Sequence, residues 1–117
     1  MPSEIFPAPS RAHAERRKSL APEIEDAFKT FSDRVFAAGA LDAKLKQLIA
    51  IACAHVTQCP YCIRGHTQLA TRHGATPQEI MEAIWVAAEM RAGGAYAHSV
   101  IALEALGPDK ERRAPVT

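Results

Sequence analysis

The chain has 117 residues, 48% of them apolar and 6% aromatic, and carries a formal net charge of +1 at pH 7. This length suits one domain, and so small a charge gives no overall field that would recruit nucleic acid or a membrane surface. No stretch approaches the roughly 20 apolar residues of a membrane span, and the first residues lack a hydrophobic signal core, so we expect a cytoplasmic protein.

Residues 1–18 contain several prolines and no clear hydrophobic period, which predicts an N-terminal arm. A first helical pattern begins at Pro22 and ends at Gly39, a typical helix stop. A second helix is expected from about Asp42, a candidate N-cap residue, to about His55.

A third helix is expected to begin at Cys59-Pro60 and to stop near Gly74. Thr76-Pro77-Gln78-Glu79 then forms a capping box, which is a start signal for a further helix. Gly93-Gly94 is expected to break that helix or to permit a close helix crossing. A last helix should end at Gly107-Pro108.

No segment alternates apolar and polar residues as a strand would, so we predict an all-α domain of about five to six helices. The helical domain is expected over residues 19–107, followed by a charged tail over 108–117. Helices this short cannot bury every apolar face within one small chain, so we expect a homo-oligomer.

The residues that could carry out a chemical reaction are concentrated in Cys59-Pro60-Tyr61-Cys62-Ile63-Arg64-Gly65-His66. On a helix, residues i and i+4 share a face, so Cys62 and His66 should be neighbours, with Cys59 at the helix start. A helix N-terminus carries about half a positive charge and favours thiolate over thiol. The motif therefore predicts a reactive dithiol with a base beside it.

The residues alone leave alternatives open. His66 favours Cys62 as the attacking sulfur, whereas the usual acidity of an N-cap thiol would favour Cys59. A zinc half-site would use His66 as a third ligand and Cys53, His55 or His73 as a fourth, but a second ligand cluster is missing. A glutaredoxin-like enzyme would need a strand before the motif, and the pattern there is helical.

Residues 41–106 resemble the alkyl hydroperoxidase D / carboxymuconolactone decarboxylase family. The matching segments are Lys46-Gln47-Leu48-Ile49-Ala50, Cys59-Pro60-Tyr61-Cys62, His66-Thr67, Gly74-Ala75-Thr76, Glu79-Ile80 and Ala92-Gly93-Gly94. The resemblance implies an all-α helix-hairpin fold that assembles as trimers or hexamers.

For chemistry, the resemblance implies a thiol-dependent peroxidase or disulfide reductase that acts on alkyl hydroperoxides. It assigns Cys62 as the peroxidatic cysteine, Cys59 as the resolving cysteine and His66 as a proton relay. It implies no metal and no cofactor beyond the redox-active disulfide, with electrons drawn from a dithiol donor such as a lipoyl-bearing protein. The decarboxylase branch typically lacks the cysteine pair, so that activity is the less favoured reading.

One position departs from the family pattern, which has a glutamate where this chain has Gln47. Glutamine can orient His66 but cannot accept a proton, so Glu89 is a candidate substitute. His55, just before the dithiol, and Tyr61, between the cysteines, are further supporting candidates. The departure also keeps open a different class, a non-enzymatic redox sensor or oligomeric module.

Overall fold

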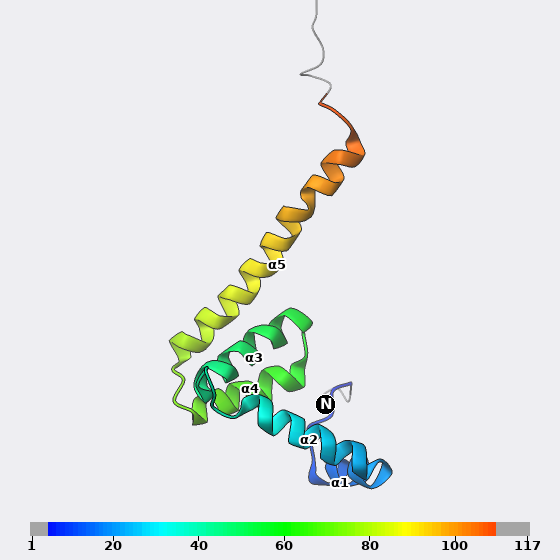
Figure 1. Ribbon diagram of the computed structural model, residues 1–117, viewed down its shortest axis with the longest axis vertical. Coiled ribbons are helices and arrows are strands. Elements are labelled where there is room, and N and C mark those ends of the chain that lie inside the picture. Colours follow the sequence, from blue (N-terminus) through cyan, green and yellow to red (C-terminus); the bar gives the residue numbers. More distant parts are fainter. Residues whose placement is uncertain (1–4, 110–117) are drawn as a thin grey trace, which may run out of the picture.

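The computed structural model describes residues 5–109, and this part of the chain has five helices and no strand (Figure 1). The helices are α1 (Arg11–Leu20), α2 (Pro22–Phe36), α3 (Ala43–Thr57), α4 (Pro60–Arg72) and α5 (Pro77–Leu106). The all-α prediction is confirmed. Residues 1–4 of the predicted arm and 110–117 of the predicted tail lie outside the described range. Within that range, no helix has both the length and the apolar run that a membrane crossing requires.

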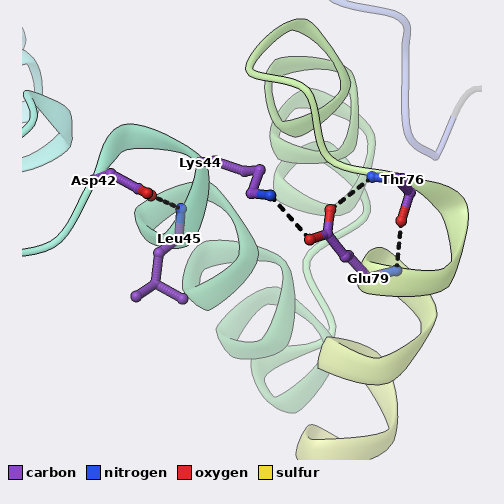
Figure 2. Close-up of polar contacts among 5 residues, drawn as sticks. All are labelled: Asp42, Lys44, Leu45, Thr76 and Glu79. Carbon is purple, nitrogen blue, oxygen red and sulfur yellow. Dashed lines mark hydrogen bonds and ion pairs between the residues drawn. The ribbon is translucent and has the colours of Figure 1, made fainter.

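The N-termini of α3 and α5 are capped by the side chains that the sequence predicts. Asp42 Oδ1 accepts a hydrogen bond from the Leu45 N–H at 2.7 Å. Thr76 Oγ1 accepts from the Glu79 N–H at 3.1 Å, and Glu79 Oε1 accepts from the Thr76 N–H at 2.9 Å, which completes the capping box. Figure 2 shows that Lys44 reaches across to the same carboxylate, with Nζ 2.9 Å from Glu79 Oε2. The two helix starts are therefore tied together.

The contacts of Glu79 in this cluster of caps make the free energy of unfolding depend on pH in the acidic range. The hydrogen bond from Lys44, and after it the Thr76 N–H, lower the pKa of Glu79. A carboxyl with a lowered pKa in the folded state stabilises the fold above its unfolded pKa of about 4.3, and this contribution is lost as pH falls through the folded pKa. We expect Glu79→Gln to flatten the loss of unfolding free energy below about pH 4.3, measured by urea unfolding across pH. Glu82→Gln, at an exposed position of the same helix, is the control, and an equal flattening in both variants would contradict the assignment.

The core lies where α3, α4 and the start of α5 meet. Ile51 and Ala70 are fully buried, Ala75 is nearly so, and Leu48, Ile80 and Ile84 pack around them. Small side chains at the centre let the helix axes approach closely, and this packing fixes α3 against α4.

One expectation about the helices is wrong. α5 is continuous through Gly93-Gly94, where a break was one of the two predicted outcomes. A β-carbon on Gly93 would lie 3.2 Å from Glu89 Oε2, so the missing side chain gives Glu89 room along its own helix. In addition, α1 occupies much of the predicted arm. Its N-cap is Ser10, whose side chain accepts a hydrogen bond from the His13 N–H. Because the helix buries no residue, its sequence shows no apolar period.

The single chain is elongated. Its principal extents are 76 × 35 × 32 Å and its radius of gyration is 21.8 Å, against about 13 Å for a compact domain of 100 residues. The far half of α5 projects away from the other helices (Figure 1). Large apolar side chains that α5 leaves exposed are Met81, Trp85, Val86, Met90, Tyr96, Val100, Ile101, Leu103 and Leu106.

Candidate functional site

The two sulfur atoms of the motif lie at the N-terminus of α4. Cys59 is the N-cap residue, and its Sγ accepts a hydrogen bond from the Cys62 N–H at 3.3 Å. Pro60 occupies the first helical position, where no N–H is needed. Both cysteines are free and half-buried, with their Sγ atoms 2.7 Å apart. Because a disulfide bond is about 2.04 Å long, a two-electron oxidation would need only a small further approach of the two sulfurs to join them.

The surroundings of the two thiols make them unequal. The hydrogen bond between the sulfurs lowers the pKa of Cys59, and the Cys62 N–H lowers it further. The same sulfur–sulfur hydrogen bond, followed by burial, raises the pKa of Cys62. The N-cap sulfur is therefore the more acidic of the two, and Cys62 needs a base before it can act as a nucleophile.

A suitable base stands on the same helix. Nδ1 of His66 lies 2.7 Å from Oε1 of Gln47, a residue of α3 that is only 3% exposed. An amide oxygen only accepts, so Nδ1 carries the proton and Nε2 keeps its lone pair. Burial lowers the pKa of His66, which keeps the ring neutral at neutral pH. Because Cys62 lies four residues before His66, the two share a face of α4.

Two of the predicted supporting residues are engaged elsewhere. Nδ1 of His55 hydrogen-bonds the Ile51 carbonyl at 2.8 Å, within α3 itself. Glu89 is exposed on α5, and its carboxylate lies beside Gly93, one turn further along the straight helix. The structure thus brings Gln47, and not Glu89, to Nδ1 of His66.

Tyr61 connects the dithiol turn to the start of the chain. Its hydroxyl donates a hydrogen bond to the Pro7 carbonyl at 2.8 Å, and its ring meets Phe6 edge-on with the centroids 6.1 Å apart. Tyr61 also forms one wall of an open hollow of about 590 Å³, between α4 and the segment that leads into α1. The N-terminal segment therefore borders the site.

The zinc alternative gains no support from the geometry. In the stretch from residue 5 to residue 109, no three His, Cys, Asp or Glu side chains are grouped so that they could hold a metal ion. Cys53 is exposed and lines a separate, largely apolar groove of about 700 Å³ together with Val86, Met90 and His98 of α5.

Sequence reasoning missed one neighbour of His66. The ring of Phe36, the last residue of α2, stacks on the imidazole with the centroids 5.0 Å apart and the planes inclined by 31°. In the sequence, Phe36 only completes an apolar helical stripe, and nothing in that pattern says which side chain it covers.

Comparison with known families identifies this helical frame. A sequence model of the carboxymuconolactone decarboxylase family matches residues 22–105. The chain belongs to the carboxymuconolactone decarboxylase family. Its helices form the alkyl hydroperoxidase D-like fold that the sequence motifs imply. The matched range covers α2 to α5 almost completely, and it includes Cys59, Cys62, Gln47 and His66.

Individual relatives agree with membership of the carboxymuconolactone decarboxylase family. An uncharacterized protein from the cox locus of Paracoccus denitrificans is 60% identical over 101 residues, which are 86% of this chain and 90% of that protein. The crystal structure of a carboxymuconolactone decarboxylase family protein from Legionella pneumophila is 34% identical, with a TM-score of 0.66 over 80% of this chain and 84% of that one.

A suggested role is known for a third relative. It is a carboxymuconolactone decarboxylase family protein from Thermotoga maritima for which a part in the antioxidative response has been suggested. Its crystal structure is 26% identical, with a TM-score of 0.51 over 70% of this chain and 94% of that one.

Proposed function

We propose that this protein is a thiol-dependent peroxidase that reduces alkyl hydroperoxides with the Cys59–Cys62 dithiol. The observation that carries the proposal is the pair of free sulfurs, 2.7 Å apart at a helix N-terminus, on the same helix as a neutral imidazole held by Gln47. The suggested antioxidative role of the Thermotoga relative supports the same chemistry.

The proposed cycle gives the attack to Cys62, which shares a helix face with His66, although its thiol is the less acidic of the two. Nε2 of His66 takes the proton of Cys62 as that sulfur attacks the terminal peroxide oxygen. The O–O bond breaks, the alkoxide leaves with the proton from His66, and Cys62 becomes a sulfenic acid. Cys59, the more acidic thiol, then attacks the sulfenic sulfur, which forms the disulfide and releases water. A dithiol donor of the lipoyl class returns two electrons by disulfide exchange.

Gln47 sets a limit on this relay. Its amide orients His66 but offers no negative charge to an imidazolium. We expect Gln47→Glu to raise the pKa of His66 and, at pH values above that pKa, to increase the rate of peroxide reduction, because a carboxylate stabilises the ring once it is protonated. The rate at saturating donor and the NMR titration of His66 measure the two effects. A raised pKa without any gain in rate would show that proton transfer does not limit turnover.

The direct test is peroxide consumption by the reduced protein with cumene hydroperoxide and dihydrolipoamide. We expect many equivalents to be consumed by the wild type and none above background by a Cys59→Ser, Cys62→Ser double variant. Cys53→Ser, which changes the thiol in the separate groove, serves as the control and should leave turnover intact.

A second candidate function rests on Gln47. An amide in place of a charged relay group also suits a redox sensor whose dithiol changes state without rapid turnover. A disulfide that titrates at a defined potential, together with negligible peroxide consumption, would favour the sensor over the peroxidase.

We further propose that the protein works as a homo-oligomer, either a trimer or a hexamer. The many exposed apolar residues of α5 and the elongated shape of the single chain support this, because large exposed apolar surfaces mark interaction sites. We expect light scattering after size-exclusion chromatography to give a multiple of the chain mass. Ile101→Glu should lower that mass, and Glu104→Gln on the same exposed segment should not.

A further inference from the structure

A phenylalanine covers one face of the relay histidine. Phe36 lies with its ring centroid 5.0 Å from that of His66, at an interplanar angle of 31°. It is half-buried, whereas Phe28 and Phe31 of the same helix are each 64% exposed. Of these three aromatic residues of α2, the structure places the last one on the imidazole.

A lysine fixes the end of the helix that carries this ring. Nζ of Lys46, on α3, donates hydrogen bonds to the carbonyls of Val35 at 2.9 Å and Ala37 at 2.6 Å. Carbonyls at a helix C-terminus lack helical partners, and a cation there is favourable. These two carbonyls belong to the residues on either side of Phe36, so the lysine fixes the backbone from which the ring projects.

The same turn of α3 fixes the imidazole. Gln47, next to Lys46 in the chain, holds Nδ1 of His66 through its amide oxygen. Two consecutive residues thus anchor the two stacked rings, one through the α2 backbone and one through the imidazole edge. Because Gln47 is 3% exposed, this anchoring point is itself buried.

The covering of His66 by Phe36 removes water from the imidazole and so affects its pKa. A hydrocarbon ring replaces water on one face of the imidazole, and loss of water disfavours the charged form. Burial is what lowers the pKa of His66. Other titratable groups on the adjoining elements include Cys62 and Arg64 of α4, Asp33 and Arg34 of α2, and Lys44 and His55 of α3, with Cys59 at the α4 N-cap. The ammonium of Lys46 on α3 is turned to the α2 carbonyls.

We propose that Phe36, fixed by Lys46, is a positioning residue that covers His66 and keeps its ring neutral, oriented and ready to accept a proton. The catalytic meaning of this arrangement rests on the proposed peroxidase function. The cover itself does not, because the protonation state of His66 can be measured without any substrate.

The test is an NMR pH titration of His66 in the reduced full-length protein. In Phe36→Leu, whose smaller side chain covers less of the imidazole, we expect the pKa of His66 to rise toward its ordinary value. Lys46→Met, which keeps a long side chain but removes the donors, should move it in the same direction. Phe36→Tyr should restore the wild-type value, and Phe28→Leu, at an exposed site of the same helix, should leave it unchanged.

A second readout connects the cover to the chemistry. The acidic limb of the pH–rate profile for oxidation of the dithiol should move upward by the same interval as the NMR pKa, because only neutral His66 accepts a proton. If the pKa is unchanged in both Phe36→Leu and Lys46→Met while their circular dichroism stays native, the proposal is wrong. If the pKa rises but the wild type turns over no peroxide, the cover stands and the peroxidase proposal fails.

Discussion

Replacement of Cys62 by serine is expected to abolish peroxide consumption, including the first equivalent. The alcohol is far less acidic than the thiol it replaces and does not form a sulfenic acid, so the O–O bond stays intact. Cys59→Ser should behave differently. It should consume one equivalent of peroxide and then stop, with a sulfenic acid trapped on Cys62, because the sulfur that resolves it is missing.

This pair of variants also separates the two assignments of the nucleophile. The lowered pKa of Cys59 makes it the more readily ionised thiol, whereas Cys62 has a raised pKa and depends on His66. Mass spectrometry of dimedone adducts after one equivalent of peroxide identifies the sulfur that was oxidised. A dimedone adduct on Cys59 in the Cys62→Ser variant would falsify the assignment of Cys62 as the attacking residue.

His66→Gln is expected to lower the rate of peroxide reduction by roughly 10²- to 10⁴-fold, the usual contribution of a positioned general acid–base. The reason is specific to this site, since Cys62 has a raised pKa and does not ionise readily without a proton acceptor. Rapid-mixing measurement of the first oxidation step, across pH, reports this effect separately from disulfide reduction by the donor.

The matched control for this variant is His98→Gln. His98 is an exposed histidine of α5 whose Nδ1 bonds the Gly94 carbonyl of its own helix at 2.7 Å. Its replacement should leave the first oxidation step unchanged. Part of the His66→Gln loss should disappear above the pKa of Cys62, where the thiolate forms without help. A loss that stays constant up to high pH would instead indicate that His66 acts after the attack, on the leaving alkoxide.

Sequence reasoning placed the helix starts well because their signals are local. Asp42, Thr76 and Cys59 each cap a helix through a side chain that bonds an N–H three residues later. The contact of the capping residue and its partner lies within one turn, so the pattern is visible in a few consecutive letters. The same locality explains why the sequence correctly predicts the cysteine pair at the N-terminus of α4.

Other features depend on contacts that no local pattern encodes. Gly93-Gly94 suggests a break, yet the rest of the thirty-residue helix on both sides propagates through it. Phe36 and His66 are far apart in the sequence, and their stacking accompanies the hydrogen bonds by which Lys46 ties the end of α2 to α3. Propagation of the helix determines the first outcome, and tertiary contact determines the second.

The length of α5 has a consequence for how this protein must be handled. Thirty helical residues span about 45 Å, more than the 35 and 32 Å of the molecule's two shorter dimensions. The outer turns of α5 expose Val100, Ile101 and Leu106 to solvent in the single chain. If copies of the chain shelter those turns, the melting temperature will rise with protein concentration, and highly dilute samples will lose the end of the helix first.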